Sequence, residues 1–184
     1  MTSESLGLTQ VGESIDYPLD TLKDPIKSRY PWLQIESLPP FVNIGEAFDS
    51  RRNQYHSTRI IALLEKQIPF TQMDRLLGIT DFDIYVPGMN FVFGEARLPG
   101  RVGVISTYRL KAKGSGKGTL YPERVLKEAV HELGHMLGLN HCEDDSCVMH
   151  FSESLKDTDN KGSALCEDCR RTLVELRNES REQR

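Results

Sequence analysis

The segment His131-Glu-Leu-Gly-His-Met-Leu-Gly-Leu-Asn-His141 contains three of the five histidines in the 184-residue chain. Because successive residues of an α-helix are about 100° apart, His131 and His135 share one face, one turn apart. Two imidazoles in this arrangement can bind one zinc ion. Glu132 lies to the side of that face, where its carboxylate can reach a water on the metal as a general base without becoming a ligand. The segment therefore predicts a metal site on a helix.

His141 requires a break in that helix. Six further helical residues add about 240° of net rotation, which would turn its side chain away from the metal. Gly138 lies between, and glycine adopts the left-handed backbone that ends helices without steric cost. We therefore expect Gly138 to act as a hinge that returns His141 as a third ligand. Three protein ligands leave one position for water, which is typical of a catalytic zinc. The alternative is a chance match on an ordinary surface helix.

All four cysteines of the chain follow this segment. Four residues separate Cys142 from Cys147, and two separate Cys166 from Cys169. Paired short spacings joined by a longer loop are typical of a tetrahedral zinc site with four thiolates. Such a site is closed and structural, so we expect two Zn²⁺ ions per chain. The alternatives are two disulfides or four free thiols.

Three other side chains near or outside these motifs have less specific interpretations. Met149 lies eight residues after His141 and is either a hydrophobic floor beneath the metal or an ordinary core methionine. His150 is expected to be a polar neighbour of the site rather than a ligand. His56 is expected to be structural or exposed.

Composition limits the class of protein. Hydrophobic residues make up 38% of the chain, which is enough for one core, so we expect a single domain over residues 1–184 with flexible ends at 1–14 and 179–184. The net charge of −4 argues against nucleic acid or an anionic membrane as partner. No apolar run is long enough to span a bilayer, and the first residues do not resemble a secretory signal. These features favour a cytoplasmic, monomeric protein.

Hydrophobic patterns and turn residues predict the order of the elements. In the N-terminal half we expect a strand at Leu6–Val11 or a frayed segment, a helix over Pro18–Tyr30, a strand at Trp32–Leu38 and a helix from Asp49 or Ser50 to Lys66.

The second half begins with three strand-like runs, of which the last two have the tight spacing of antiparallel neighbours. A flexible, basic segment follows and is expected to be a surface connector, with a substrate-facing loop as the alternative. Two helices come last. These elements are expected at Phe82–Val86, Phe91–Phe93, Arg101–Tyr108, 111–118, Pro122–Leu137 and Leu165–Arg177.

The run from His131 to Cys142, together with Cys147-Val-Met149 and Cys166-Glu-Asp-Cys169, resembles the archaemetzincins, a branch of the metzincin zinc peptidases. The resemblance is strongest from Asp81 to Arg171. It implies an α/β (α+β) fold, namely a compact single-domain metzincin-like (zincin) fold. Such a fold has a twisted mixed β-sheet, an active-site helix, a Met-turn and a C-terminal helix.

The resemblance also implies roles for the residues of both motifs. It places the catalytic zinc on His131, His135 and His141, with Glu132 as the general base. It places the structural zinc on the four cysteines and Met149 in the Met-turn. In metzincins the substrate pairs with an edge strand above the cleft, and Phe91–Gly94 is the candidate here.

The function that the resemblance implies is that of a zinc-dependent metallopeptidase acting on a peptide or protein, without naming the natural substrate. One departure is Phe151, which stands two residues after Met149, where some metzincin branches carry a tyrosine that helps to stabilise the transition state. The alternative is therefore a catalytically weak or inactive module that binds peptides or proteins through the same zinc cleft. A metal store or sensor is disfavoured, because two preorganised sites would exchange zinc poorly.

Overall fold

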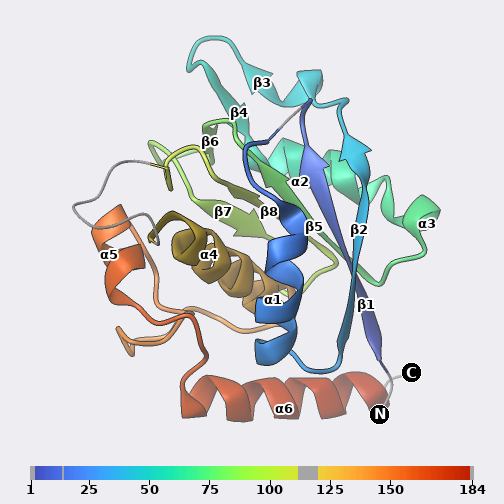
Figure 1. The fold of residues 1–184 in the computed structure, drawn as a ribbon, viewed down its shortest axis with the longest axis vertical. Coiled ribbons are helices and arrows are strands. Elements are labelled where there is room, and N and C mark those ends of the chain that lie inside the picture. The colour runs from blue at the N-terminus through green and yellow to red at the C-terminus, as the bar shows by residue number, and fades with distance from the viewer. Residues whose placement is uncertain (1–2, 14, 112–119, 183–184) are drawn as a thin grey trace.

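The computed structural model describes residues 3–13, 15–111 and 120–182. Its main sheet has five strands in the order β2-β1-β5-β8-β7 (Figure 1). Four strands run parallel to one another, and the edge strand β7 (Gly94–Ala96) is antiparallel to β8. The parallel strands are β1 (Glu4–Val11), β2 (Leu33–Phe41), β5 (Arg75–Thr80) and β8 (Val102–Ser106). The sheet is therefore mixed, as predicted.

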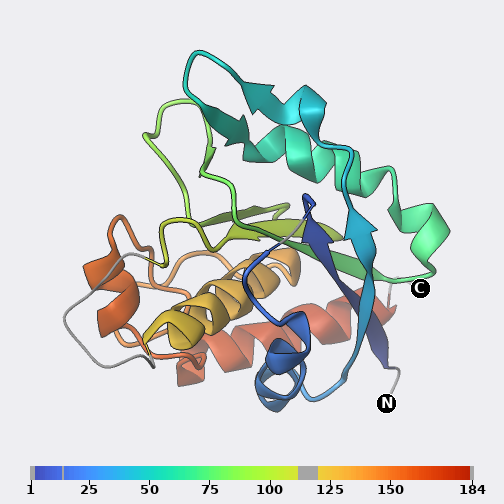
Figure 2. The ribbon, with the colours of Figure 1, turned by 45° about the horizontal axis from the view of Figure 1, so that its top comes forward.

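Helices cover both faces of this sheet (Figure 2). β8 is buried along its whole length and β5 along all but its first residue, as is typical of parallel strands between two helical layers. One face packs against α4 (Leu120–Met136) and α1 (Lys23–Arg29), and α6 (Glu167–Glu182) joins the same hydrophobic core. The opposite face packs against α2 (Ser57–Glu65) in a second core. The long helix α4 thus lies beside β7 and β8, which places its residues next to the sheet edge.

A second, three-stranded sheet and four short helices complete the described part of the chain. The small sheet has the order β3-β4-β6, formed by β3 (Phe48–Asp49), β4 (Gln54–His56) and β6 (Ile84–Tyr85). The short helices are η1 (Leu19–Leu22), η2 (Gly45–Ala47), α3 (Ile68–Thr71) and α5 (Leu155–Asn160). None of the helices in the described residues, long or short, combines the length and the apolar character needed to cross a bilayer.

Several predicted elements are confirmed. Residues 6–11 form a strand, because β1 pairs with β2 on one side and β5 on the other. The helix expected over Pro18–Tyr30 is present as η1 followed by α1, and Pro25 lies in the first turn of α1, where its missing N–H is not needed. The antiparallel pair expected in the middle of the chain is present as β7 and β8.

The helix predicted from Asp49 or Ser50 begins too early. In the structure, α2 starts at Ser57, and the residues before it form the hairpin of β3 and β4. Asp49 does not cap a helix: its carboxylate accepts hydrogen bonds from the Arg51 amide, at 3.0 Å, and from the Tyr85 hydroxyl, at 2.7 Å. A local turn therefore uses the side chain that the sequence suggested as a cap.

Other boundaries also differ. Phe91–Phe93 is not a strand, and the strand starts one residue later, at Gly94. The central strand β5 and the helix α5 were not predicted. α6 continues to Glu182 instead of ending at Arg177. Of the predicted surface connector, residues 112–118 lie outside the described part of the chain.

The central strand gives a test of the sheet packing. A Cβ at Gly78 of β5 would lie 2.7 Å from Val11 Cγ2 and 2.8 Å from Leu64 Cδ1. We expect Gly78→Val to lower the free energy of unfolding by about 1–3 kcal/mol, because the core must be overpacked to hold the side chain. Urea denaturation measures the change. Gly45→Val is the control, since a Cβ at Gly45 meets no atom within 4 Å; equal losses in both variants would contradict the packing.

Candidate metal centres and active site

The active-site helix α4 ends at the predicted hinge. The Gly138 amide donates to the carbonyl of His135, at 2.9 Å, and the Leu139 amide donates to the carbonyl of Gly134, at 2.9 Å. These two bonds, with φ of +102° at Gly138, form the Schellman arrangement that ends many helices. The chain reverses there and brings His141 back to the helix.

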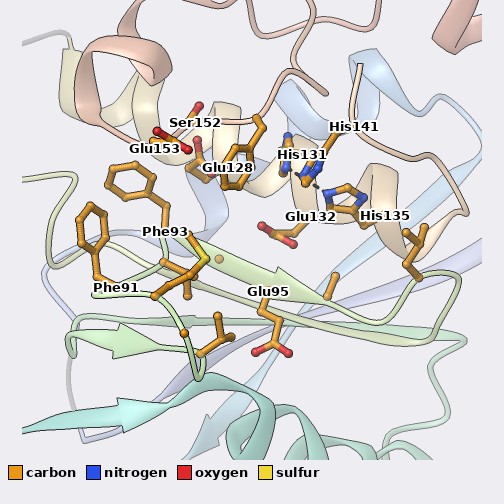
Figure 3. A pocket seen from close by; sticks show the side chains of 18 of the residues that line it. Phe91, Phe93, Glu95, Glu128, His131, Glu132, His135, His141, Ser152 and Glu153 are labelled. Atoms are coloured by element: carbon orange, nitrogen blue, oxygen red, sulfur yellow. Dashed lines mark hydrogen bonds between the residues drawn. The ribbon is translucent and has the colours of Figure 1, made fainter. Parts of the chain in front are cut away.

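The three histidines of the motif converge in space. Their ligand atoms all lie within 4.8 Å of one another. The Nε2 atoms of His131 and His135 are 3.1 Å apart, close to the separation of about 3.3 Å between two nitrogens of a tetrahedral zinc site. The ring of His141 lies 5.4 Å from that of His131 and 4.7 Å from that of His135. Figure 3 shows the imidazoles gathered at one side of the cleft, close to Glu132.

Backbone carbonyls fix the orientation of two of these rings. His131 Nδ1 donates to the carbonyl of Val148, at 2.8 Å, and His135 Nδ1 donates to the carbonyl of Leu139, at 2.7 Å. Since the Nδ1 atoms carry the protons, the Nε2 lone pairs face the shared centre. Burial lowers the pKa of all three imidazoles, most strongly at His131. The rings are therefore held in the neutral form that binds a metal.

Glu132 lies beside the histidines, against the edge strand. It is only 4% exposed, and its Oε2 is buried without a hydrogen-bond partner in the described residues. A Cβ at Gly94 would lie 2.5 Å from Glu132 Oε1, so the missing side chain of Gly94 leaves the space that the carboxylate occupies. Burial, and next to it the negative charge of Glu128, raise the pKa of Glu132 well above its usual value. A buried carboxylate with an unused oxygen is suited to accept a proton.

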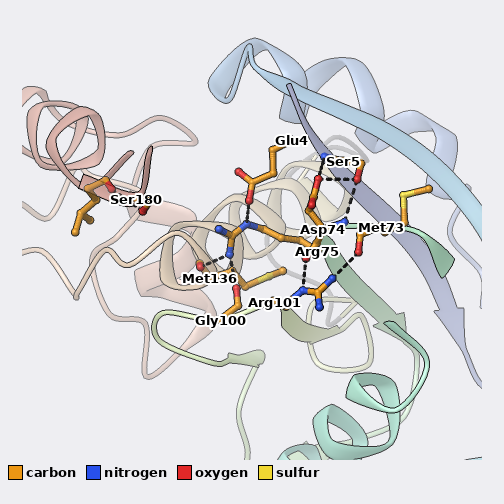
Figure 4. Close-up of polar contacts among 10 residues, drawn as sticks. Glu4, Ser5, Met73, Asp74, Arg75, Gly100, Arg101, Met136 and Ser180 are labelled. Carbon is orange, nitrogen blue, oxygen red and sulfur yellow. Dashed lines mark hydrogen bonds and ion pairs between the residues drawn. The ribbon is translucent and has the colours of Figure 1, made fainter. Parts of the chain in front are cut away.

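The C-terminal end of α4 is fixed from the sheet. The Arg75 guanidinium of β5 donates to the carbonyls of Met136 and Gly100 and forms a 2.7 Å ion pair with Glu4 of β1 (Figure 4). The Gly100 amide also donates to the Met136 carbonyl, at 3.1 Å. Carbonyls in the last turn of a helix lack partners within the helix, and a cation there is favourable. Arg75 thus holds the helix directly before the hinge.

The four cysteines form a second cluster, with ligand atoms within 4.8 Å of one another. The Sγ atoms of Cys142 and Cys166 are 3.8 Å apart, and those of Cys147 and Cys169 are 3.7 Å apart. These separations exclude disulfide bonds of about 2.05 Å in this structure. Two sulfurs of a tetrahedral zinc site with Zn–S bonds of about 2.3 Å are about 3.8 Å apart. The geometry therefore suits a metal held by four thiolates.

Residues Cys147–His150, here called the Met-turn, lie between the two clusters. The Met149 carbonyl accepts the Cys142 amide, at 3.0 Å. Met149 is fully buried, and its side chain would overlap any Cβ added at Gly134 of α4. The methionine therefore packs directly under the active-site helix. His150 donates from Nδ1 to the Cys142 carbonyl, at 2.9 Å, and is outside the histidine cluster.

A cleft of about 580 Å³ runs past the histidines. Its wall on the sheet side is β7, whose outer edge is not paired with another described strand. The Phe93 carbonyl and the Arg97 amide hydrogen-bond to β8. Because successive residues of a strand direct their N–H and C=O groups to opposite sides, those of Gly94 and Ala96 point to the free edge. Apolar side chains also line the cleft, and they include Val86, Met89, Phe91, Phe93, Leu98 and Phe151.

Four functional positions were not predicted from the sequence. Gly94 and Gly134 make room for Glu132 and Met149, and Arg75 and Lys161 support the helix and the Met-turn. Only Gly134 carried a usable signal, because a glycine inside a helix costs about 1 kcal/mol and is usually kept for close packing. His56 lies at the end of β4, its ring 5.1 Å from that of Tyr85, away from both clusters.

Known proteins resemble this chain in sequence and fold. The family model described as peptidase family M54 matches residues 37–175. An archaemetzincin from Archaeoglobus fulgidus is 48% identical over 124 residues, which are 67% of this chain and 71% of that protein. The crystal structure of archaemetzincin from Methanopyrus kandleri superposes with a TM-score of 0.85 at 34% identity. That match covers 96% of this chain and 97% of the other.

A third comparison is with a zinc-dependent peptidase from Methanocorpusculum labreanum. Its structure matches with a TM-score of 0.78 at 26% identity and covers 91% of this chain and 99% of the other. The resemblance seen in the sequence motifs and the predicted mixed α/β fold are both confirmed. The chain therefore belongs to peptidase family M54, the archaemetzincins, and is a zinc metallopeptidase.

Proposed function

We propose that His131, His135 and His141 hold the catalytic zinc and that Glu132 is the general base of peptide-bond hydrolysis. The observation that carries this assignment is the convergence of the three imidazoles beside a buried carboxylate oxygen without a partner. All these residues come from one chain, so we also propose that a monomer holds the complete site.

The donor set fits zinc. Two imidazoles already carry their protons on Nδ1, and their Nε2 atoms are separated by nearly the distance that zinc requires. Three nitrogen ligands leave a coordination position open, which distinguishes a catalytic zinc from a structural one. A zinc ion bound there supplies Lewis acidity to the scissile carbonyl and to the attacking water.

The protein side of the reaction rests on Glu132. Its carboxylate accepts the proton of the attacking water and then donates that proton to the leaving amine. Gly94 allows the carboxylate to lie close to the edge strand, where the substrate backbone is expected. The free edge of β7 at Gly94 and Ala96 can hydrogen-bond an extended peptide. This edge replaces Phe91–Gly94 as the candidate pairing segment.

We propose that the cysteine cluster holds a second, structural zinc, which gives two ions per chain. Four thiolates would fill its coordination sphere and leave no position for water. The cluster joins the Met-turn to the first turn of α6, because Cys147 lies in the turn and Cys169 in the helix. A zinc ion there would therefore stabilise the turn that packs beside the histidine cluster.

One observation favours a second candidate function, a chain that binds peptides in this cleft without rapid cleavage. Phe151 lies in the cleft, 39% exposed, with its ring 4.9 Å from that of His141. A phenyl ring cannot donate the hydrogen bond that a tyrosine would offer to the transition state. This candidate predicts affinity for extended peptides without products.

The first test addresses the general base. We expect Glu132→Gln to retain both zinc ions and to lower kcat by at least about 100-fold, because the amide cannot accept the proton. Metal analysis and cleavage of a peptide library by wild type and variant measure both effects. Full activity in the variant would remove Glu132 from the mechanism, whereas peptide binding without cleavage by wild type would support the second candidate.

The second test addresses the space next to the base. We expect Gly94→Ala to keep zinc but to lower kcat by about 100-fold, because the new methyl group displaces the carboxylate of Glu132. Gly103→Ala on β8 is the matched control, since its Cβ would contact Met136 Sδ at 3.0 Å but not Glu132. Steady-state kinetics measure kcat for both variants. Similar kcat values would show that a methyl group at Gly94 does not displace the Glu132 carboxylate.

The third test addresses the cysteine cluster. We expect Cys166→Ser to release one of two zinc ions and to lower the melting temperature, since a structural zinc contributes folding free energy. Elemental analysis and thermal unfolding measure these changes. Two retained ions and an unchanged melting temperature are incompatible with a structural zinc at this position.

A further inference from the structure

Lys161, directly after α5, is buried in the protein interior. The residue is only 2% exposed, and its side chain is fully buried. Its Nζ forms an ion pair with Glu128 Oε1, at 3.3 Å, and donates to the carbonyl of His150, at 3.2 Å. Removing a charged group from water costs several kcal/mol, so a fully buried ammonium is expected to have a specific role.

The first partner of this ammonium belongs to the active-site helix. Glu128 precedes Glu132 by one turn of α4, lines the cleft and is itself buried. The Thr158 hydroxyl of α5 donates to the same Oε1, at 3.3 Å. The carboxylate is therefore held at a defined place on the cleft floor (Figure 3).

The second partner belongs to the Met-turn. The His150 carbonyl, which Lys161 binds, is two residues after the Val148 carbonyl, which orients the ring of His131. Between them, Met149 packs against Gly134. One ammonium thus joins the turn to the helix that carries His131 and Glu132.

We propose that Lys161 is a positioning residue, whose ammonium joins the Met-turn to α4 and thereby holds the imidazole of His131 in its metal-binding orientation. The inference rests on the proposed zinc site and extends it to a residue that touches neither metal nor substrate. Without this contact, the turn loses one of its links to α4 and keeps those of Val148 and Met149, so the Val148 carbonyl is held less firmly.

The chain contains a matched comparison in Lys127. This lysine is also buried, at 3% exposure, and lies on α4. Its Nζ donates to the carbonyls of Thr158, at 3.0 Å, and Asp159, at 3.1 Å, so it joins α4 to α5. None of its contacts in the described residues reaches the Met-turn. A role limited to stability would make the two lysines equivalent.

The experiment compares Lys161→Met with Lys127→Met. We expect both variants to melt at lower temperature, but only Lys161→Met to weaken zinc at the histidine site, by about 10–100-fold, as for other groups that orient a metal ligand. Competition with a chelator measures the zinc affinity. We expect kcat to fall in Lys161→Met with KM nearly unchanged. Equal zinc affinities in the two variants would overturn the proposal.

The double variant Glu128→Leu with Lys161→Met separates positioning from charge balance. It removes both members of this buried ion pair, so we expect the melting temperature to recover. The contact to the Met-turn is still missing, so we expect the zinc affinity to stay low. Full recovery of the zinc affinity would show that only the unpaired Glu128 charge matters and would also overturn the proposal.

A readout on the chain with zinc only in the cysteine cluster keeps this inference separate from the proposed function. We expect the Nδ1 proton of His131 to exchange slowly in NMR spectra of wild type and Lys127→Met, and rapidly in Lys161→Met. Slow exchange in all three proteins would contradict the positioning role. A wild-type chain with no zinc at the histidine site would contradict the proposed function alone.

Discussion

The reversal of the backbone at Gly138 is the constraint on which the active site depends. Its positive φ lets α4 close in a Schellman arrangement, and the next residue, Leu139, turns its carbonyl to the ring of His135. The same turn directs the chain back so that His141 meets the other two imidazoles. An L-residue with a side chain rarely adopts this conformation, so one glycine determines both where the helix ends and where His141 lies.

The Met-turn adds a second constraint, because it lies between both clusters. The Val148 carbonyl orients the ring of His131, and Met149 packs against α4 at Gly134. Cys147 is part of the sulfur cluster. Close packing allows no independent movement of these groups. The cysteine cluster is therefore linked to the histidine cluster by geometry, because it includes Cys147 of a turn whose Val148 carbonyl orients the ring of His131.

Sequence periodicity and spacing predict what depends on local geometry. The active-site helix, the hinge at Gly138 and the histidine cluster follow from positions within a few turns of each other, and the paired short spacings of the cysteines indicate the second cluster. The central strand β5 was missed because its short apolar run contains Gly78 and has no alternating pattern. The roles of Gly94 and Lys161 depend on contacts across more than ten residues of chain, which spacing does not reveal. The start of α2 was predicted too early because the Asp49 carboxylate accepts a hydrogen bond within a turn instead of capping a helix.

The adjacency of His141 and Cys142 in the chain links the geometry of the two clusters. Joining the Sγ atoms of Cys142 and Cys166 would shorten their separation from 3.8 Å to about 2.05 Å. The backbone that carries Cys142 would have to follow, and the neighbouring imidazole would move with it. A disulfide between Cys142 and Cys166 would therefore displace part of the nitrogen cluster as well.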